Sequence, residues 1–245
     1  MSASPAAPAR SLRAAFGAVT ALTAAFSAVV LPLPAQAQVA PTTSEIAAYG
    51  GLHAAAARGD VAATLRLAAA DPAALRLRDA HGRTPLHVAT FARKAGAIVA
   101  LARSGAALDA LDDDRYDAVT IASVADDEAT LDVLLALGAS ARRVTSRYDG
   151  TALIAAAHLG HDGVVRRLIA AGAPLDHVNN LHWTAMIESI VLGDGGQRHQ
   201  ATLAALLGAG ASTALADRTG RTPLALARDR GYREMVRMLE AAGAR

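Results

Sequence analysis

The sequence contains no cysteine, and this absence excludes several classes of protein. Without thiols the chain has no disulfide framework, no thiolate metal site and no catalytic cysteine. Aromatic residues make up only 3% of the chain, whereas hydrophobic residues as a whole make up 53%. A core of this composition must pack alanine, leucine, valine and isoleucine closely. It therefore suits stacked helices better than strands, which favour branched and aromatic residues.

The first 37 residues have the order of a secretory signal. Arg10 and Arg13 form a basic region, residues 14–31 are uncharged and mostly apolar, and Ala35-Gln36-Ala37 offers a cleavage site. The alternative is an uncleaved membrane anchor, because the apolar stretch approaches the ~20 residues that cross a bilayer. Two prolines just before the site favour cleavage. We therefore expect a signal peptide at 1–37, export to a bacterial periplasm or beyond, and no membrane span in the mature chain.

Removal of this segment also changes the charge of the chain. The formal net charge is +2, but two of the 24 basic residues are Arg10 and Arg13, and no acidic residue precedes Glu45. The mature chain therefore carries 22 basic and 22 acidic residues. A net charge of zero removes the general attraction toward phosphate backbones, so we do not expect a nucleic-acid partner.

An internal repeat organises nearly everything after Glu45. The segment 82–106 recurs as 220–244, and in both a glycine follows a threonine by 21 residues. Two further units keep the same interval, a fifth is five residues longer, and a degenerate first unit precedes them. The unit starts are Gly50, Thr84, Asp117, Thr151, Thr184 and Thr222.

Each unit has the start and stop signals of two helices. Threonine or aspartate at the unit start can cap the first helix, and Pro85 and Pro223 occupy the first helical position, where a missing N–H costs nothing. A second helix of the type seen at 164–169 ends at a glycine such as Gly172. One helix pair cannot bury its apolar face alone, so neighbouring units must stack. The many charges of the last helix predict a capping repeat.

Three features resemble the ankyrin repeat: the TPLH sequence at 84–87, the D-x-x-G-x-T sequences at 79–84 and 217–222, and the Gly-Ala pairs that end the second helices. The resemblance covers nearly the whole mature chain. It implies an all-α solenoid of about six ankyrin repeats, each a helix-turn-helix with a hairpin loop, stacked in one curved, monomeric domain. We expect this domain at 46–245, preceded by a flexible segment at 38–45.

The resemblance also implies that a partner binds the hairpin tips and the concave face made by the first helices. In the third to fifth units, the glycine two positions before the helix cap is replaced by Arg115, Asp149 and His182. Asp and His tolerate a positive φ better than most residues, whereas Arg needs a different turn or some strain.

The tips of these three units have acidic, basic and aromatic-polar character in turn. Because tyrosine, tryptophan and arginine dominate interface hot spots, we predict a partner-binding surface on them. Its residues are Asp113, Asp114, Tyr116, Arg143, Arg147, Tyr148, His182 and Trp183. In the alternative interpretation, the acidic and basic tips only neutralise each other, and Trp183 covers the neighbouring hairpin.

The function indicated is a non-catalytic protein-protein interaction module of the bacterial envelope, with an unidentified protein partner and no cofactor. The alternative is a small-ligand or metal carrier that uses the loop histidines His177 and His182, although their spacing is not diagnostic of a metal site. His53 and His87 occupy the structural histidine position of the resembled family. An enzyme is a third choice, since no nucleophile elbow, phosphate-binding glycine loop or triad is present. The glycine-rich insertion at 193–197 is interpreted as a mobile loop between two helices, more often tolerated than functional.

Overall fold

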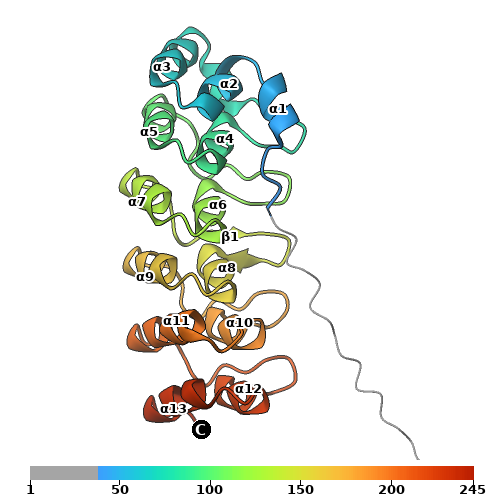
Figure 1. The fold of residues 1–245 in the computed structure, drawn as a ribbon, viewed down its shortest axis with the longest axis vertical. Helices are drawn as coiled ribbons and strands as arrows, with labels where there is room; N and C mark the ends of the chain where they lie inside the picture. The colour runs from blue at the N-terminus through green and yellow to red at the C-terminus, as the bar shows by residue number, and fades with distance from the viewer. Residues whose placement is uncertain (1–37) are drawn as a thin grey trace, which may run out of the picture. The chain divides into compact units, whose positions relative to one another are not determined.

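The computed structural model describes residues 38–245, in which successive helix pairs stack one on the next (Figure 1). The predicted signal segment 1–37 lies outside the described residues. The helices are α1 (Thr43–Ala48), α2 (Gly51–Arg58), α3 (Val61–Ala70), the 3-10 helix η1 (Pro72–Arg76), α4 (Pro85–Phe91), α5 (Ala95–Arg103), α6 (Ala118–Val124), α7 (Glu128–Ala136), α8 (Ala152–His158), α9 (Asp162–Ala170), α10 (Ala185–Val191), α11 (Gln197–Gly208), α12 (Pro223–Asp229) and α13 (Arg233–Ala241).

These helices form two layers. The first helices of the repeats, α2, α4, α6, α8, α10 and α12, pack in sequence against one another, and the second helices, α3, α5, α7, α9, α11 and α13, do the same beside them. Two-residue strands β1 (Val144–Thr145) and β2 (Gly150–Thr151) pair antiparallel as the arms of one hairpin. The predicted helical repeat solenoid of six helix pairs is confirmed.

The first helices begin where the sequence predicts, and in the repeats after α2 a polar side chain satisfies free N–H groups of the first turn. Asp117 Oδ1 accepts from Thr120 N at 2.8 Å, and Thr151 Oγ1 accepts from Ile154 N at 3.3 Å. Pro85 and Pro223 stand in the first turns of α4 and α12. Each first helix thus starts at the same repeat position.

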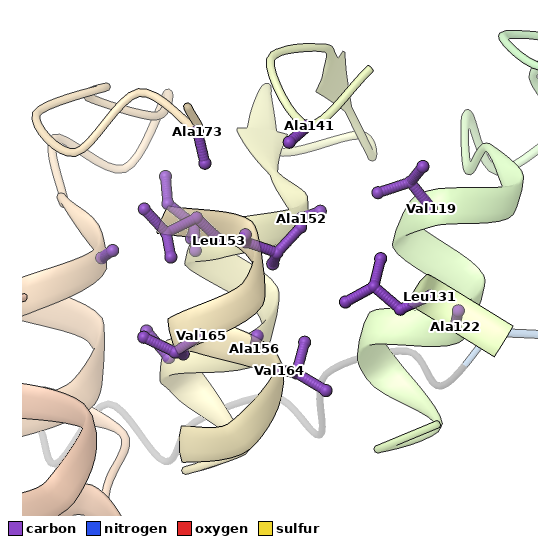
Figure 2. Close-up of a cluster of buried hydrophobic side chains, with 14 of the residues drawn as sticks. Val119, Ala122, Leu131, Ala141, Ala152, Leu153, Ala156, Val164, Val165 and Ala173 are labelled. Carbon is purple, nitrogen blue, oxygen red and sulfur yellow. The ribbon is translucent and has the colours of Figure 1, made fainter. Parts of the chain in front are cut away.

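The core consists mainly of small and branched aliphatic side chains from neighbouring repeats (Figure 2). Leu131, Leu153 and Val164 are fully buried, and so are alanines such as Ala122 and Ala156. The small alanine side chains allow the helix backbones to approach closely, while leucine and valine fill the remaining volume. This packing explains how a chain with so few aromatic residues forms a continuous core.

His87 joins the second repeat to the third. Its Nδ1 lies 2.8 Å from Thr84 Oγ1, and its Nε2 lies 3.0 Å from the carbonyl oxygen of Ala110 and 3.1 Å from that of Tyr116. Burial lowers the pKa of His87 to about 4, although the two carbonyl groups oppose this shift. The imidazole is therefore neutral at neutral pH and has the structural role that the family resemblance implies.

We expect His87 to make the fold sensitive to acid. Because its pKa is about 4 in the folded chain but near 6.5 when unfolded, the unfolded state gains a proton first as the pH falls. The free energy of unfolding should decrease between pH 6.5 and 4 by up to about 3 kcal/mol through this residue. Urea unfolding across this range should show a shallower decrease for His87→Gln, which cannot titrate. Parallel profiles for the two proteins would contradict this assignment.

The folded domain begins earlier than expected. Residues 38–45 are predicted to be flexible, but α1 starts at Thr43, inside that segment. Thr42 and Glu45 form a reciprocal capping box, and the Val39 carbonyl oxygen accepts a hydrogen bond from Arg83. The contacts that hold this segment come from Arg83, a residue far along the chain.

Candidate functional site

The loops before the first helices are hairpins, and in four of them an Asp or Asn side chain forms a hydrogen bond across the hairpin. This side chain lies five positions before the helix cap, and its oxygen accepts from the backbone N–H of the residue just before the cap. The bonds join Arg83 N to Asp79 (2.9 Å), Tyr116 N to Asp112 (2.8 Å), Trp183 N to Asn179 (3.0 Å) and Arg221 N to Asp217 (3.0 Å). The residue before the cap is thereby held in a fixed position at the base of each hairpin.

The three substituted turn positions keep the backbone conformation that glycine has elsewhere. Arg115, Asp149 and His182 have φ values of 65°, 52° and 64°, close to the 71° of Gly82. This is the left-handed region that side chains usually avoid. The turn is therefore retained at Arg115, and the strain anticipated there is present.

Neighbouring tips are linked to one another through the backbone. The amide of Asp113 donates to the His81 carbonyl at 3.1 Å, that of Ser146 to Arg115 at 2.9 Å, and that of Asn180 to Tyr148 at 3.0 Å. Tips from consecutive repeats consequently lie side by side, which places the predicted site residues on one continuous edge.

Most charges on this edge are paired between the third and fourth repeats. Arg115 Nη1 lies 2.9 Å from Asp149 Oδ1, Arg143 Nη1 lies 3.2 Å from Asp109 Oδ2, and Arg147 pairs with Asp114. The pairs are largely exposed to solvent, so each contributes only about 0 to 1 kcal/mol to stability. For Asp114, Arg143 and Arg147, the geometry matches the alternative in which acidic and basic tips neutralise each other. Asp113 is exposed.

Of the aromatic residues of the predicted site, Tyr116 and Trp183 lie at the bases of their hairpins, just before the helix caps, whereas Tyr148 lies in the turn between β1 and β2. Tyr116, Tyr148 and Trp183 are each partly buried, and Trp183 packs against the hydrophobic core. Burial and the nearby carboxylates of Asp114 and Asp112 raise the pKa of Tyr116, so its phenol stays neutral. His182 is exposed, with its Nδ1 3.2 Å from Arg218 Nη2. Each aromatic comes from a different repeat, so they form a row along the edge.

A second row belongs to the concave face that the family resemblance implies, although its residues were not named from the sequence. It lies on the side of the first helices turned away from the second helices, which we call the inner face. Seven positions after the cap, successive repeats place there Phe91, Val124, His158 and Val191, all partly buried. An alignment of the repeats could have identified this row, because the residue type at these positions varies between units, whereas the buried positions stay apolar.

One buried carboxylate interrupts the inner face. Glu188 on α10 accepts from Asn179 Nδ2 at 2.8 Å, and its other oxygen lies 3.5 Å from His158 Nδ1. The side chain of Glu188 is only 7% exposed, so both partners are needed to offset its lost hydration. This cluster connects the hairpin of the fifth repeat to the helix of the fourth.

The insertion of the fifth repeat is tied down on both sides, contrary to the mobile loop expected. Tyr232 donates to the Gly193 carbonyl at 2.8 Å, and His199 Nδ1 lies 2.8 Å from Asp194 Oδ1. A Cβ atom on Gly193 would lie 2.1 Å from the Ser189 carbonyl oxygen, so only glycine fits there. Gln197 already belongs to α11, whose 12 residues exceed the 9 of α9, so part of the insertion lengthens this helix.

The loop histidines have separate protein partners. His177 Nε2 lies 2.6 Å from the Asp149 carbonyl oxygen, whereas His182 faces the Arg218 guanidinium. Within residues 38–245, no group of three or more potential ligands is placed to hold a metal ion. The contacts of His177 and His182 do not favour the carrier interpretation.

No helix among residues 38–245 combines the length and apolar character that crossing a bilayer requires.

Comparisons with known proteins agree with the repeat architecture. A family model described as ankyrin repeats in three copies matches residues 153–245. The putative ankyrin repeat protein YahD of Escherichia coli K12 is 35% identical over 167 residues, which are 68% of this chain and 83% of that protein.

Two solved structures extend this likeness to about four fifths of the chain. The chain is similar to an ankyrin repeat domain from Acinetobacter baumannii AYE, with 43% identity, a TM-score of 0.73, and coverage of 79% of this chain and 98% of that one. It is also similar to the ankyrin repeat domain of Bcl-3, a member of the IkappaB protein family, with 26% identity, a TM-score of 0.72, and coverage of 80% and 87%.

Proposed function

Because this chain belongs to the ankyrin-repeat family, we propose that it binds a specific protein partner in the bacterial envelope and catalyses no reaction. Ankyrin repeat domains are generally protein-interaction modules and typically non-enzymatic scaffolds. The matches indicate no enzymatic family. The partner surface in this proposal combines the hairpin tips of the third to fifth repeats with the adjacent inner face.

The observation that carries this proposal is the row of Tyr116, Tyr148 and Trp183 on linked hairpins. The backbone N–H groups of Tyr116 and Trp183 are held by the hairpin bonds, and that of Tyr148 lies 3.3 Å from Ser146 Oγ, so little backbone entropy remains to be lost on binding. Each ring is partly buried and still reachable by solvent, as expected of an anchor that a partner completes. The surrounding ion pairs form a polar rim, which favours orientation more than affinity.

The envelope location in this proposal is supported by the order of basic, apolar and small residues in 1–37, which the structure does not describe. The balanced charge of the mature chain supports a protein partner over a nucleic acid.

Replacement of Trp183 and Tyr148 by alanine should weaken partner capture by at least about 30-fold, because interface hot spots contribute about 2 kcal/mol or more. Crosslinking in living cells, followed by identification of bound proteins, would find the partner with the unaltered chain. Binding of that partner to the double variant is then measured directly.

Two controls keep this test specific. Helix content by circular dichroism should stay unchanged in the double variant, because neither residue lies within a helix. A matched aromatic change, Tyr232→Ala beside the insertion, should leave capture intact. Undiminished capture by the Trp183 and Tyr148 variant would refute the tip surface.

A further inference from the structure

Residues 38–49, which we call the N-terminal strap, lie on the inner face of the first two repeats. Figure 1 shows α1 on the side of α2 opposite α3. Ala40, Pro41 and Ile46 of the strap surround a small apolar cavity together with Val88 and Phe91 of α4. The strap therefore packs in these repeats on the helix position that Val124 and Val191 occupy further along the stack.

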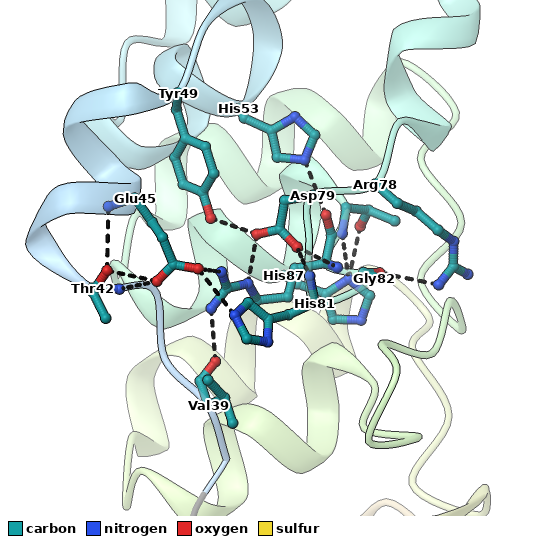
Figure 3. Close-up of polar contacts among 12 residues, drawn as sticks. Val39, Thr42, Glu45, Tyr49, His53, Arg78, Asp79, His81, Gly82 and His87 are labelled. Atoms are coloured by element: carbon teal, nitrogen blue, oxygen red, sulfur yellow. Dashed lines mark hydrogen bonds and ion pairs between the residues drawn. The ribbon is translucent and has the colours of Figure 1, made fainter.

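Polar contacts with one buried guanidinium hold the strap in place. The side chain of Arg83 is only 1% exposed; its Nη2 lies 2.5 Å from Glu45 Oε1, and its Nη1 donates to the Val39 carbonyl at 2.8 Å. Arg83 Nε lies 2.6 Å from Asp79 Oδ2, which also accepts from Tyr49 at 2.6 Å. Figure 3 shows Val39, Glu45 and Tyr49 converging on this hairpin.

The repeat register shows which of these contacts the fold itself supplies. Arg221 occupies the position of Arg83 in the last repeat and pairs with Asp217, the counterpart of Asp79. Among residues 38–245 no second segment covers Arg221, whose side chain is 50% exposed. The aspartate is thus an internal partner of the arginine, whereas the carboxylate of Glu45 and the carbonyl of Val39 are additions made by the strap.

The strap itself is weakly constrained. Its helix α1 has six residues, none of them buried, and Ile46 remains 43% exposed. A helix this short does not form alone in water, so its order depends on the contacts with the repeats. The carboxylate of Glu45 also lies 3.2 Å from His81 Nε2. The strap is therefore held by a few polar contacts over an incompletely filled apolar surface.

We propose that the inner face of the first two repeats is a peptide-binding groove occupied in this structure by the strap, and that an acidic peptide of a partner protein can displace it. The matching peptide carries a carboxylate for Arg83 and a neighbouring apolar residue for the surface around Phe91. The groove lies apart from Tyr148 and Trp183. The tests of the two sites are therefore independent: the tips can fail to capture a partner while the groove binds peptide, and the groove can fail to bind peptide while the tips capture a partner.

The test uses a fluorescently labelled synthetic peptide of residues 38–49 as the probe and the full chain as the receptor. In the wild-type chain, the tethered strap competes at high effective concentration and suppresses binding of the probe. In a Glu45→Gln chain the tethered strap loses its ion pair with Arg83. Fluorescence anisotropy should then show the probe binding at least about 10-fold more tightly than to the wild type.

Matched controls separate strap release from other effects. A Glu234→Gln chain loses an exposed carboxylate on α13 and should bind the probe as weakly as the wild type. A probe that carries Glu45→Gln should bind the Glu45→Gln chain at least about 10-fold more weakly than the unaltered probe. Hydrogen exchange of the Glu45→Gln chain should be faster at residues 43–48 only, which shows that the repeats remain folded.

Equal binding of the probe to the wild-type and Glu45→Gln chains would overturn the proposal. So would equal binding of the two probes, because Arg83 would then play no part in recognition. A Glu45→Gln chain that elutes as a dimer would assign the groove to strap exchange between two copies and would also overturn it.

Discussion

Replacement of Arg83 by alanine is expected to lower the free energy of unfolding by about 3 kcal/mol, because it leaves a largely enclosed aspartate without its cationic partner. The Arg83 side chain is 1% exposed and that of Asp79 10%. The change also removes the contacts to Glu45 and Val39, so the strap loses two of its polar attachments. The equivalent change at Arg221 also leaves an enclosed aspartate, since the side chain of Asp217 is 4% exposed, but it removes no contact with the strap and is therefore expected to cost less.

Urea unfolding followed by circular dichroism gives both values, and the difference between the two variants is the decisive quantity. The two arginines share a repeat position and an aspartate partner, so the intrinsic conformational effect of an Arg-to-Ala change is the same in both variants and cancels in the difference. Equal losses of stability would show that the strap contacts contribute nothing to the fold.

Acid should reduce the difference between wild type and Arg83→Ala. Burial opposes the shift at Asp79, but hydrogen bonds from Tyr49, the His81 and Arg83 amides and the Arg83 side chain lower its pKa to about 2. Thr42 and Arg83 lower the pKa of Glu45 to about 2 as well. A lowered carboxylate pKa stabilises the fold above its unfolded value near 4, and that stabilisation is lost as the pH falls toward 2. The wild type should therefore lose more stability than the variant over this range.

Replacement of Leu153 by alanine should destabilise the domain by about 3 kcal/mol, the usual cost of a cavity at a fully buried leucine. Leu153 on α8 is 0% exposed and lies in the core cluster of Figure 2. The helix packs against both α6 and α10, so a defect there weakens the interfaces on both sides of the fourth repeat.

Leu159, at the C-terminal end of the same helix, provides the matched control. It is 38% exposed, and its replacement by alanine should cost less than about 1 kcal/mol. In urea unfolding, Leu153→Ala should shift the midpoint with little change in slope if the stack unfolds cooperatively. A loss at Leu153 no greater than at Leu159 would contradict the assigned packing.

The features that the sequence predicts correctly are local. Thr151 and Asp117 cap helices because their side-chain oxygens accept from N–H groups of the first helical turn. Pro85 fits the first turn because its ring fixes φ at a helical value and a missing N–H costs nothing there. Six copies of these signals fix the repeat register and, with it, the stack. The family follows from the same local signals.

The features that the sequence does not predict depend on contacts between distant residues. The order of α1 requires Arg83, which is 38 residues from Glu45, and the insertion is fixed by Tyr232, which is 39 residues from Gly193. The ion pairs between neighbouring tips could nevertheless be predicted from the sequence, because Arg115 and Asp149 are 34 residues apart, which is one repeat length. Opposite charges at one repeat position predict an ion pair along the stack.

Trp183 gives this molecule an intrinsic optical probe. It is the one tryptophan of the chain, and it stands partly buried at the base of the fifth hairpin. Its fluorescence therefore reports the environment of that hairpin, and a partner that excludes water there should shift the emission toward blue. In a stack whose repeats contact only their neighbours, melting followed at this indole can differ from melting followed by average helicity. The separation of the two curves measures how cooperatively the fifth repeat is coupled to the rest.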